Sequence, residues 1–209
     1  MEDQLQNPPP QNSFFSGFLS SLIFVWDFLK VIIIALAVIL PVRYFLFQPF
    51  IVSGSSMEPN FSHGQYLIID ELSYRLRAPI RGEVIVLHYP KDRKQFFIKR
   101  IVGLPGETVE IDNGRVTVTN AEQKITLEEP YLQNQGLTFP HNTTVVGGKK
   151  TITLSSTEYF MLGDNRLASS DSRDWGPLDK KDMVGRVLFR ILPLPELARF
   201  KAPSYSFSQ

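Results

Sequence analysis

The segment RGEVIVLHYPKDRKQFFIKRIVG, residues 81–103, decides the fold because it contains two runs of strand-forming residues. These runs, EVIVLHY (83–89) and QFFIKRIV (95–102), are rich in β-branched and aromatic side chains. Such side chains fit the pleated surface of a sheet better than the surface of a helix. The segment therefore predicts two strands of a mostly β domain.

Further runs of the same kind lie on both sides of this segment. They are YLIID (66–70), TVEI (108–111), RVTVT (115–119), KITL (124–127), EYFML (158–162) and VGRVLFRIL (184–192). Asn113-Gly114 stands between two of them and predicts a two-residue hairpin turn. Residues 120–157 are polar, with loops and weak strands, and resemble an insertion. We expect one β domain over residues 48–209, with an inserted cap region at about 112–157.

The residues before this domain have a different character. Residues 1–13 are polar and interrupted by prolines, and we expect a disordered leader over residues 1–21. The stretch VIIIALAVILPV (31–42) is uninterrupted apolar sequence, and with its flanks it predicts a transmembrane anchor over residues 22–47. A buried core helix is the alternative, and a cleaved signal peptide fits worse because the leader is acidic. The charges beside the run do not specify an orientation.

Composition excludes several classes of function. The 209 residues include 22 basic and 21 acidic side chains, a net charge of +1 that gives no electrostatic reason for a nucleic-acid partner. Cysteine is absent, which excludes disulfides, thiol nucleophiles and cysteine zinc sites. The three histidines lie far apart and no HExxH motif occurs, so we expect neither a metal nor a cofactor.

The first candidate site is the turn Gly54-Ser55-Ser56-Met57-Glu58-Pro59. Glycine and proline on either side of a serine hold its hydroxyl on a tight, rigid turn. The GxSxG pattern fails at Glu58, and the SxxK pattern fails at Pro59, which excludes two known serine-enzyme motifs. An ordinary surface turn is the alternative.

The second candidate is Lys99. Strand alternation sets it on one face with Phe97 and Ile101, while Ile98 and Arg100 point to the other. Desolvation, and repulsion from the neighbouring Arg100, are expected to lower its pKa, as a lysine base near neutral pH requires. The alternative is an edge-strand lysine that reaches water.

The third candidate is the polar loop GDNRLASSDSRDWG, residues 163–176. Asp171 and Arg173 are suited to a structural ion pair, and the serines can form a hydrogen bond to a buried amine. The spacing does not fit an EF-hand, because Arg166 takes a ligand position. A solvated loop is the alternative.

Together these blocks resemble the type I signal peptidases, a membrane-anchored serine and lysine family that removes secretory signal peptides. The resemblance rests on SGSSMEPNF (53–61), YLIIDELSYR (66–75), RGEVIVLHYP (81–90), FIKRIVGLPGE (97–107) and GDNRLASSDSRDWG (163–176). It covers most of the chain, from the anchor to about Arg186.

The resemblance implies a role for each matching residue. Ser56, directly before Met57, matches the family's nucleophile, and Lys99 matches its general base. Ser169 matches the serine that orients the lysine, and the supporting positions are Asp164, Asp171 and Arg173. The oxyanion hole uses the N–H of Ser56, while Gly54 stands where some members carry a second, hydroxyl donor. The family prefers Ala-x-Ala before the cleaved bond, and the expected pocket walls are Phe50, Val52, Phe97 and Ile98.

The resemblance also implies an all-β catalytic core with a smaller inserted β region, a cytoplasmic N-terminus and a catalytic domain outside the cell membrane. The expected partners are preproteins that carry signal peptides, and the lipid bilayer. Two alternatives remain. A self-cleaving repressor of the LexA type requires a DNA-binding helix-turn-helix where this chain has its apolar segment. A catalytically silent anchored β domain would bind exported proteins only.

Overall fold

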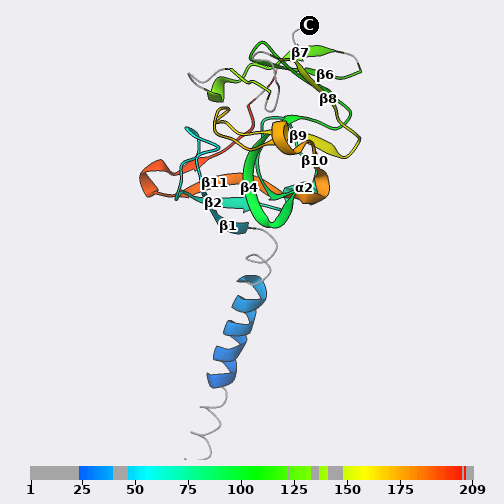
Figure 1. Ribbon diagram of the computed structural model, residues 1–209. Helices are drawn as coiled ribbons and strands as arrows, with labels where there is room; N and C mark the ends of the chain where they lie inside the picture. Colours follow the sequence, from blue (N-terminus) through cyan, green and yellow to red (C-terminus); the bar gives the residue numbers. More distant parts are fainter. Residues whose placement is uncertain are drawn as a thin grey trace, which may run out of the picture. The chain divides into compact units, whose positions relative to one another are not determined.

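The computed structural model describes residues 24–39, 47–121, 123–132, 137–140, 148–203 and 205 (Figure 1). The chain divides into two compact units, Met1–Tyr44 and Phe45–Gln209. In the first unit, residues 24–39 form a helix whose side chains are exposed. Among the described residues, no helix combines the length and the apolar character that crossing a membrane requires. The expected leader, residues 1–21, lies outside the described residues.

The second unit is built on two antiparallel sheets. The larger sheet has the strand order β1-β2-β11-β3-β4-β9-β10, and β12 pairs with β11. Its strands are β1 (Phe47–Ile51), β2 (Tyr66–Asp70), β3 (Val84–Tyr89), β4 (Asp92–Gly103), β9 (Glu158–Leu162), β10 (Leu178–Asp179), β11 (Met183–Leu192) and β12 (Ala198–Arg199). The expected mostly β architecture is confirmed.

The smaller sheet lies between β4 and β9 in the chain and has the order β7-β6-β5-β8. Its strands are β5 (Thr108–Asp112), β6 (Arg115–Thr119), β7 (Lys124–Thr126) and β8 (Lys150–Thr153). The hairpin expected at Asn113-Gly114 is present, because Asp112 pairs with Arg115 across it. Both turn residues have positive φ, 48° and 77°, which is the conformation that this turn type demands.

The helical elements of the second unit are short, each a single turn. They are α2 (Ser73–Leu76), η1 (Pro130–Leu132), α3 (Ser172–Trp175), η2 (Lys180–Asp182) and η3 (Leu194–Glu196). The Asp171 side chain accepts a hydrogen bond from the Arg173 N–H at the start of α3. This cap begins a helical turn inside the polar loop 163–176.

Two strands differ from the sequence-based expectation. The sequence pattern predicts no strand at Phe47–Ile51, because this apolar sequence directly continues that of the expected anchor. In the structure these residues form β1, which pairs along its whole length with β2. Pro49 is tolerated there because β1 lies at the sheet edge. Strand β4 starts at Asp92 and is longer than expected, because polar residues with exposed side chains extend it outward from the sheet.

The core explains why Lys99 is buried. Ile98 packs against a cluster that contains Met57 and Phe61. Ile101 belongs to a second cluster, and Val102 belongs to the core of the smaller sheet. Strand β4 therefore contributes residues to all three clusters, and Lys99 lies between them on this strand.

Candidate active site

The turn that carries Ser56 is fixed by its own backbone and by two core side chains. Gly54 has a φ of +96°, in the left-handed region that favours glycine, and begins the turn. The Glu58 N–H donates to the Ser55 carbonyl at 3.1 Å. Met57 and Phe61 are almost fully buried. The turn is therefore anchored directly after Ser56, which itself stays partly exposed.

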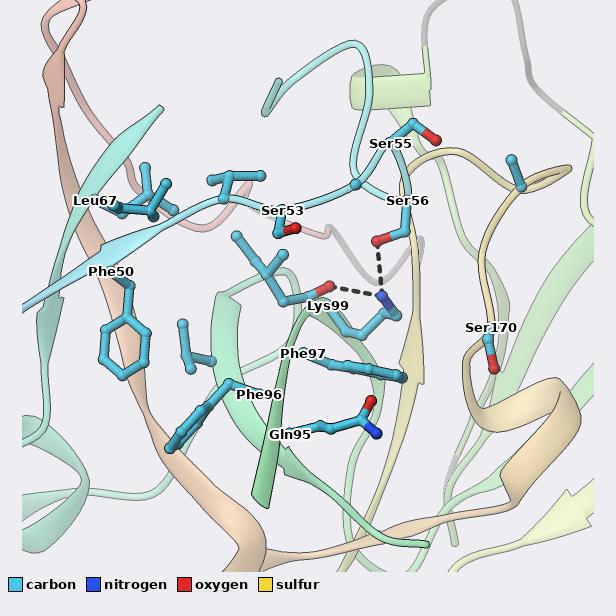
Figure 2. A pocket seen from close by; sticks show the side chains of 16 residues that line it. Phe50, Ser53, Ser55, Ser56, Leu67, Gln95, Phe96, Phe97, Lys99 and Ser170 are labelled. Carbon is cyan, nitrogen blue, oxygen red and sulfur yellow. Dashed lines mark hydrogen bonds between the residues drawn. The ribbon is translucent and has the colours of Figure 1, made fainter. Parts of the chain in front are cut away.

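Lys99 reaches this turn from β4. Its side chain is 3% exposed, and its Nζ lies 2.8 Å from Ser56 Oγ and 2.9 Å from the carbonyl oxygen of Ile98. Figure 2 shows the Ser56 hydroxyl directed at Lys99, whereas the Ser55 hydroxyl points away from it. The structure thus brings together the serine and the lysine that the sequence singled out, 43 residues apart.

Burial lowers the pKa of Lys99 from its ordinary value of 10.5 to about 8. The carboxylates of Asp171 and Asp164 raise this pKa in part, and the guanidinium of Arg173 lowers it. The repulsion expected from Arg100 is not among the causes, because alternation along β4 directs Arg100 to the opposite face. The expectation of a lowered pKa is confirmed, whereas the guanidinium that lowers it is that of Arg173 and not that of Arg100.

Arg100 is instead the partner of Asp164. Its Nε donates to Oδ1 at 2.8 Å and its Nη2 donates to Oδ2 at 2.6 Å, and the carboxylate is fully buried. The Asn60 side-chain amide also donates to this carboxylate, at 2.9 Å. Asp164 therefore joins β4, the polar loop and the turn that carries Ser56.

The ion pair expected between Asp171 and Arg173 is present, with Arg173 Nη2 donating to Asp171 Oδ2 at 2.8 Å. Both side chains are buried. The same carboxylate accepts a hydrogen bond from the Gly163 N–H at 3.0 Å. The pair therefore closes the loop onto its own first residue.

Ser169 is buried, but the hydrogen bond expected between its hydroxyl and Lys99 is not present. Within the described residues its Oγ has no hydrogen-bond partner. A Cβ added to Gly163 would meet Ser169 Oγ at 2.1 Å and the Ser56 carbonyl oxygen at 2.5 Å. Ser169 therefore packs against the glycine that separates it from the turn, while Lys99 takes the Ile98 carbonyl as its second partner.

A cavity of about 530 Å³ opens beside this pair. All four expected wall residues line it, namely Phe50, Val52, Phe97 and Ile98. The cavity (Figure 2) has further lining residues that no sequence pattern singles out, which are Ile51, Ser53, Leu67, Val86, Gln95, Phe96, Ala168 and Ser170. Leu67 and Val86 belong to β2 and β3 and read as ordinary core positions, so no sequence signal distinguishes them.

The backbone around Ser56 is only partly engaged. The Gly54 N–H donates to His63 Nδ1 at 3.3 Å, so this N–H already has a partner. No hydrogen bond among the described residues uses the Ser56 N–H. Within the same residues no three His, Cys, Asp or Glu side chains gather as metal ligands. The arrangement thus combines a hydroxyl, an amine of lowered pKa and an unused N–H at the edge of an apolar cavity.

Comparison with known proteins identifies the family. The family model described as signal peptidase, peptidase S26, matches residues 25–192. The chain belongs to this signal peptidase family. The resemblance expected from the five sequence blocks is therefore confirmed.

Relatives of this signal peptidase match over most of its length. It is 32% identical over 181 residues to a probable signal peptidase I-1 of Synechocystis sp., covering 80% of this chain and 85% of the relative. It is 33% identical over 177 residues to signal peptidase I P of Bacillus subtilis subsp. natto, covering 84% and 93%. A crystal structure of a signal peptidase I from Enterococcus faecalis V583 is 28% identical, with a TM-score of 0.43, and covers 53% of this chain and 97% of that one.

Proposed function

We propose that this signal peptidase removes N-terminal signal peptides from exported preproteins, with Ser56 as nucleophile and Lys99 as general base. The observation that carries the proposal is the 2.8 Å separation of Lys99 Nζ and Ser56 Oγ at the edge of the cavity. A general base must lie within hydrogen-bond reach of the proton that it accepts, and its pKa must be close to the working pH. Lys99 meets both conditions, since its pKa is about 8.

The reaction proceeds in two stages. Neutral Lys99 accepts the hydroxyl proton while Ser56 Oγ bonds to the carbonyl carbon before the scissile bond, and the π electrons move onto the carbonyl oxygen. The ammonium then gives its proton to the leaving amine as the C–N bond breaks. Water hydrolyses the acyl-enzyme by the same steps, with Lys99 again accepting and returning a proton. No histidine is required.

Supporting residues hold the Ser56 and Lys99 side chains in position. Asp171 and Arg173 close the polar loop, and Asp164 connects it to β4 and to the turn. We assign Ser169 a supporting role through its position beside Gly163, since its hydroxyl has no hydrogen bond in the part of the chain that the structure describes. Gly54 supports the turn through its backbone, because its φ of +96° lies in the left-handed region that favours glycine.

The developing oxyanion needs hydrogen-bond donors, and stabilising it is usually the largest catalytic contribution. The Ser56 N–H is suited to this task because it has no partner among the described residues. The Gly54 N–H donates to His63, which argues against it as a second donor.

Specificity for small residues at positions −1 and −3 follows from the walls of the cavity. Phe50 in β1, Val52 just after β1 and Ile98 in β4 line the cavity, together with Leu67 in β2 and Val86 in β3. A bulky side chain would meet these apolar walls, whereas alanine needs little space. Rapid cleavage of a substrate with Phe at −1 would contradict this assignment.

We further propose that residues 22–47 anchor the protein in the cell membrane, with the second unit on the extracytoplasmic side. The apolar, exposed side chains of helix 24–39 support this assignment. An anchored enzyme acts on substrates that are themselves held at the membrane by their signal peptides.

One experiment tests the proposed function. The full chain is purified in detergent and incubated with a preprotein, and the new N-terminus of the product is identified by mass spectrometry. Cleavage after an Ala-x-Ala site, abolished by Ser56→Ala, is the expected result. Cleavage that persists in Ser56→Ala would contradict the proposed nucleophile. A protein that binds the preprotein without cleaving it would favour the catalytically silent alternative.

A further inference from the structure

Asn165 has an unusual position beside the nucleophile. Its backbone N–H donates to the Ser56 carbonyl at 3.0 Å, and its side-chain Nδ2 donates to the Ser55 carbonyl at 3.2 Å. Its Oδ1 accepts a hydrogen bond from the Ala168 N–H at 3.3 Å. One residue of the polar loop thus contacts the carbonyls of both peptide units that flank the Ser56 side chain.

The contact to Ser55 has a direct consequence for the oxyanion donor. The Ser55 carbonyl and the Ser56 N–H belong to the same peptide unit, which is planar and, in its trans form, points the two groups in opposite directions. A donor that fixes the direction of the carbonyl therefore also fixes the direction of the N–H. The side-chain amide of Asn165 donates to the carbonyl on one edge of this peptide unit, and the proposed oxyanion donor, the Ser56 N–H, lies on the opposite edge.

Two donors approach the Ser55 carbonyl. The Glu58 N–H reaches it from within the turn at 3.1 Å, and Asn165 Nδ2 reaches it from the polar loop at 3.2 Å. A carbonyl oxygen has two lone pairs that lie close to its peptide plane, so two donors constrain the orientation of the plane more than one. The Glu58 contact orients the unit within its own turn, whereas the Asn165 contact orients it relative to the loop that contains Asp171 and Ser169.

The placement of Asn165 relative to the cavity agrees with this role. Ala168 and Ser170 of the same loop line the cavity, but Asn165 does not. Asn165 therefore contacts the turn from outside the cavity, while the Ser56 N–H leaves the other edge of the peptide unit. No hydrogen bond among the described residues occupies that N–H.

We propose that Asn165 is a positioning residue that aims the Ser56 N–H at the oxyanion through the carbonyl of Ser55. This inference rests on the proposed function, because it needs Ser56 as nucleophile. Asn165 touches neither the substrate nor the reacting atoms. Its loss should weaken the binding of the tetrahedral state and leave the binding of the ground state nearly unchanged.

The test compares two inhibitors on the full chain in detergent. A substrate-like peptide aldehyde accepts Ser56 Oγ at its carbonyl carbon, so its π electrons move onto the oxygen and the serine proton passes to Lys99. The matching peptide alcohol has no carbonyl and forms no oxyanion. The ratio of their inhibition constants therefore measures the oxyanion hole, separately from the affinity for the peptide.

Three variants are measured, each at a pH where its activity has reached a plateau. Asn165→Ala removes the donor to Ser55 and the acceptor for Ala168, whereas Asn165→Asp removes the donor, keeps the acceptor and adds a negative charge. Loss of a direct oxyanion donor costs about 100- to 1,000-fold in kcat, and an indirect contact with the Glu58 bond retained is expected to cost about tenfold. We expect both variants to lose about tenfold in aldehyde preference and in kcat, with KM and alcohol binding nearly unchanged. Asn120→Ala, in the turn between β6 and β7 and far from Ser56 in the chain, is the matched control and should behave as wild type.

The outcomes separate the inference from the proposed function. If Asn165→Asp keeps the wild-type aldehyde preference and only Asn165→Ala loses it, Asn165 acts through Ala168 and the inference is wrong. An equal loss of aldehyde and alcohol binding would likewise overturn it, because that result indicates general loosening of the site. If the wild-type enzyme is not acylated at Ser56, or Ser56→Ala stays active, the proposed function itself fails.

Discussion

Replacing Lys99 by methionine should change how the stability of the protein depends on pH. Burial holds the pKa of Lys99 near 8 in the folded chain, against an ordinary value of 10.5. Between these values the unfolded chain binds more protons than the folded chain, so the free energy of unfolding of the wild type rises with pH. Below this window the folded protein bears the full cost of a buried ammonium, and above it the cost is gone.

The size of the effect follows from the two values. A tenfold change in a proton dissociation constant corresponds to about 1.4 kcal/mol, so the interval from 10.5 to about 8 corresponds to about 3 kcal/mol. Methionine has no proton to lose. The advantage of Lys99→Met over the wild type should therefore shrink by about 3 kcal/mol between about pH 7 and about pH 11.

Comparing the two proteins at each pH isolates this contribution. Lys99→Met also removes the contacts to Ser56 and to the Ile98 carbonyl. That loss changes the difference in unfolding free energy between variant and wild type by nearly the same amount at every pH. Other ionisable groups titrate in both proteins, so their contributions to the free energy of unfolding cancel in the difference. Chemical denaturation of the full chain in a nonionic detergent, followed by tryptophan fluorescence, gives the free energies. Lys99→Leu is the control, since it packs differently but should show the same dependence on pH.

A difference in unfolding free energy that stays constant over this range would refute the reasoning. It would mean that Lys99 is protonated with nearly the same affinity in the folded and unfolded chains. The buried position of its amine would then not be the reason for its activity as a base.

Four further predictions concern activity. The value of kcat/KM should rise with pH through a limb near 8, because only neutral Lys99 accepts a proton; a pH–rate profile checks this, and a limb at the ordinary lysine value of 10.5 would contradict it. Lys99→Arg should be inactive throughout the profile, because a guanidinium does not deprotonate in this range. Ser56→Ala should abolish cleavage while Ser55→Ala retains most of it, because only the Ser56 hydroxyl faces Lys99; an inactive Ser55→Ala enzyme with an unchanged fold would argue for the other serine. Gly163→Ala should inactivate the enzyme, because its Cβ would meet Ser169 Oγ and the Ser56 carbonyl at 2.1 and 2.5 Å; wild-type cleavage of a preprotein by this variant would show that the loop moves aside without cost.

The sequence by itself determined the features that depend on local pattern. Short runs of β-branched and aromatic residues located most of the strands, and Asn113-Gly114 located the hairpin because that turn type needs two residues with positive φ. The Ser-Met turn, the lysine in a β-branched strand and the polar loop identified the family, since each block has a short and specific spacing. The ion pair of Asp171 and Arg173 was also predictable, because the two residues are neighbours in one loop.

Only the tertiary structure decided the features that depend on residues distant in the chain. Arg100 is next to Lys99 in sequence but on the other face of β4, where Asp164 neutralises it. Leu67 and Val86 both line the cavity although β11 lies between β2 and β3 in the sheet, an order that no local pattern encodes. Asn165 contacts Ser55 across 110 residues of chain. Hydrophobic pattern specifies which faces are buried, but the packing of those faces against one another decides which polar groups meet.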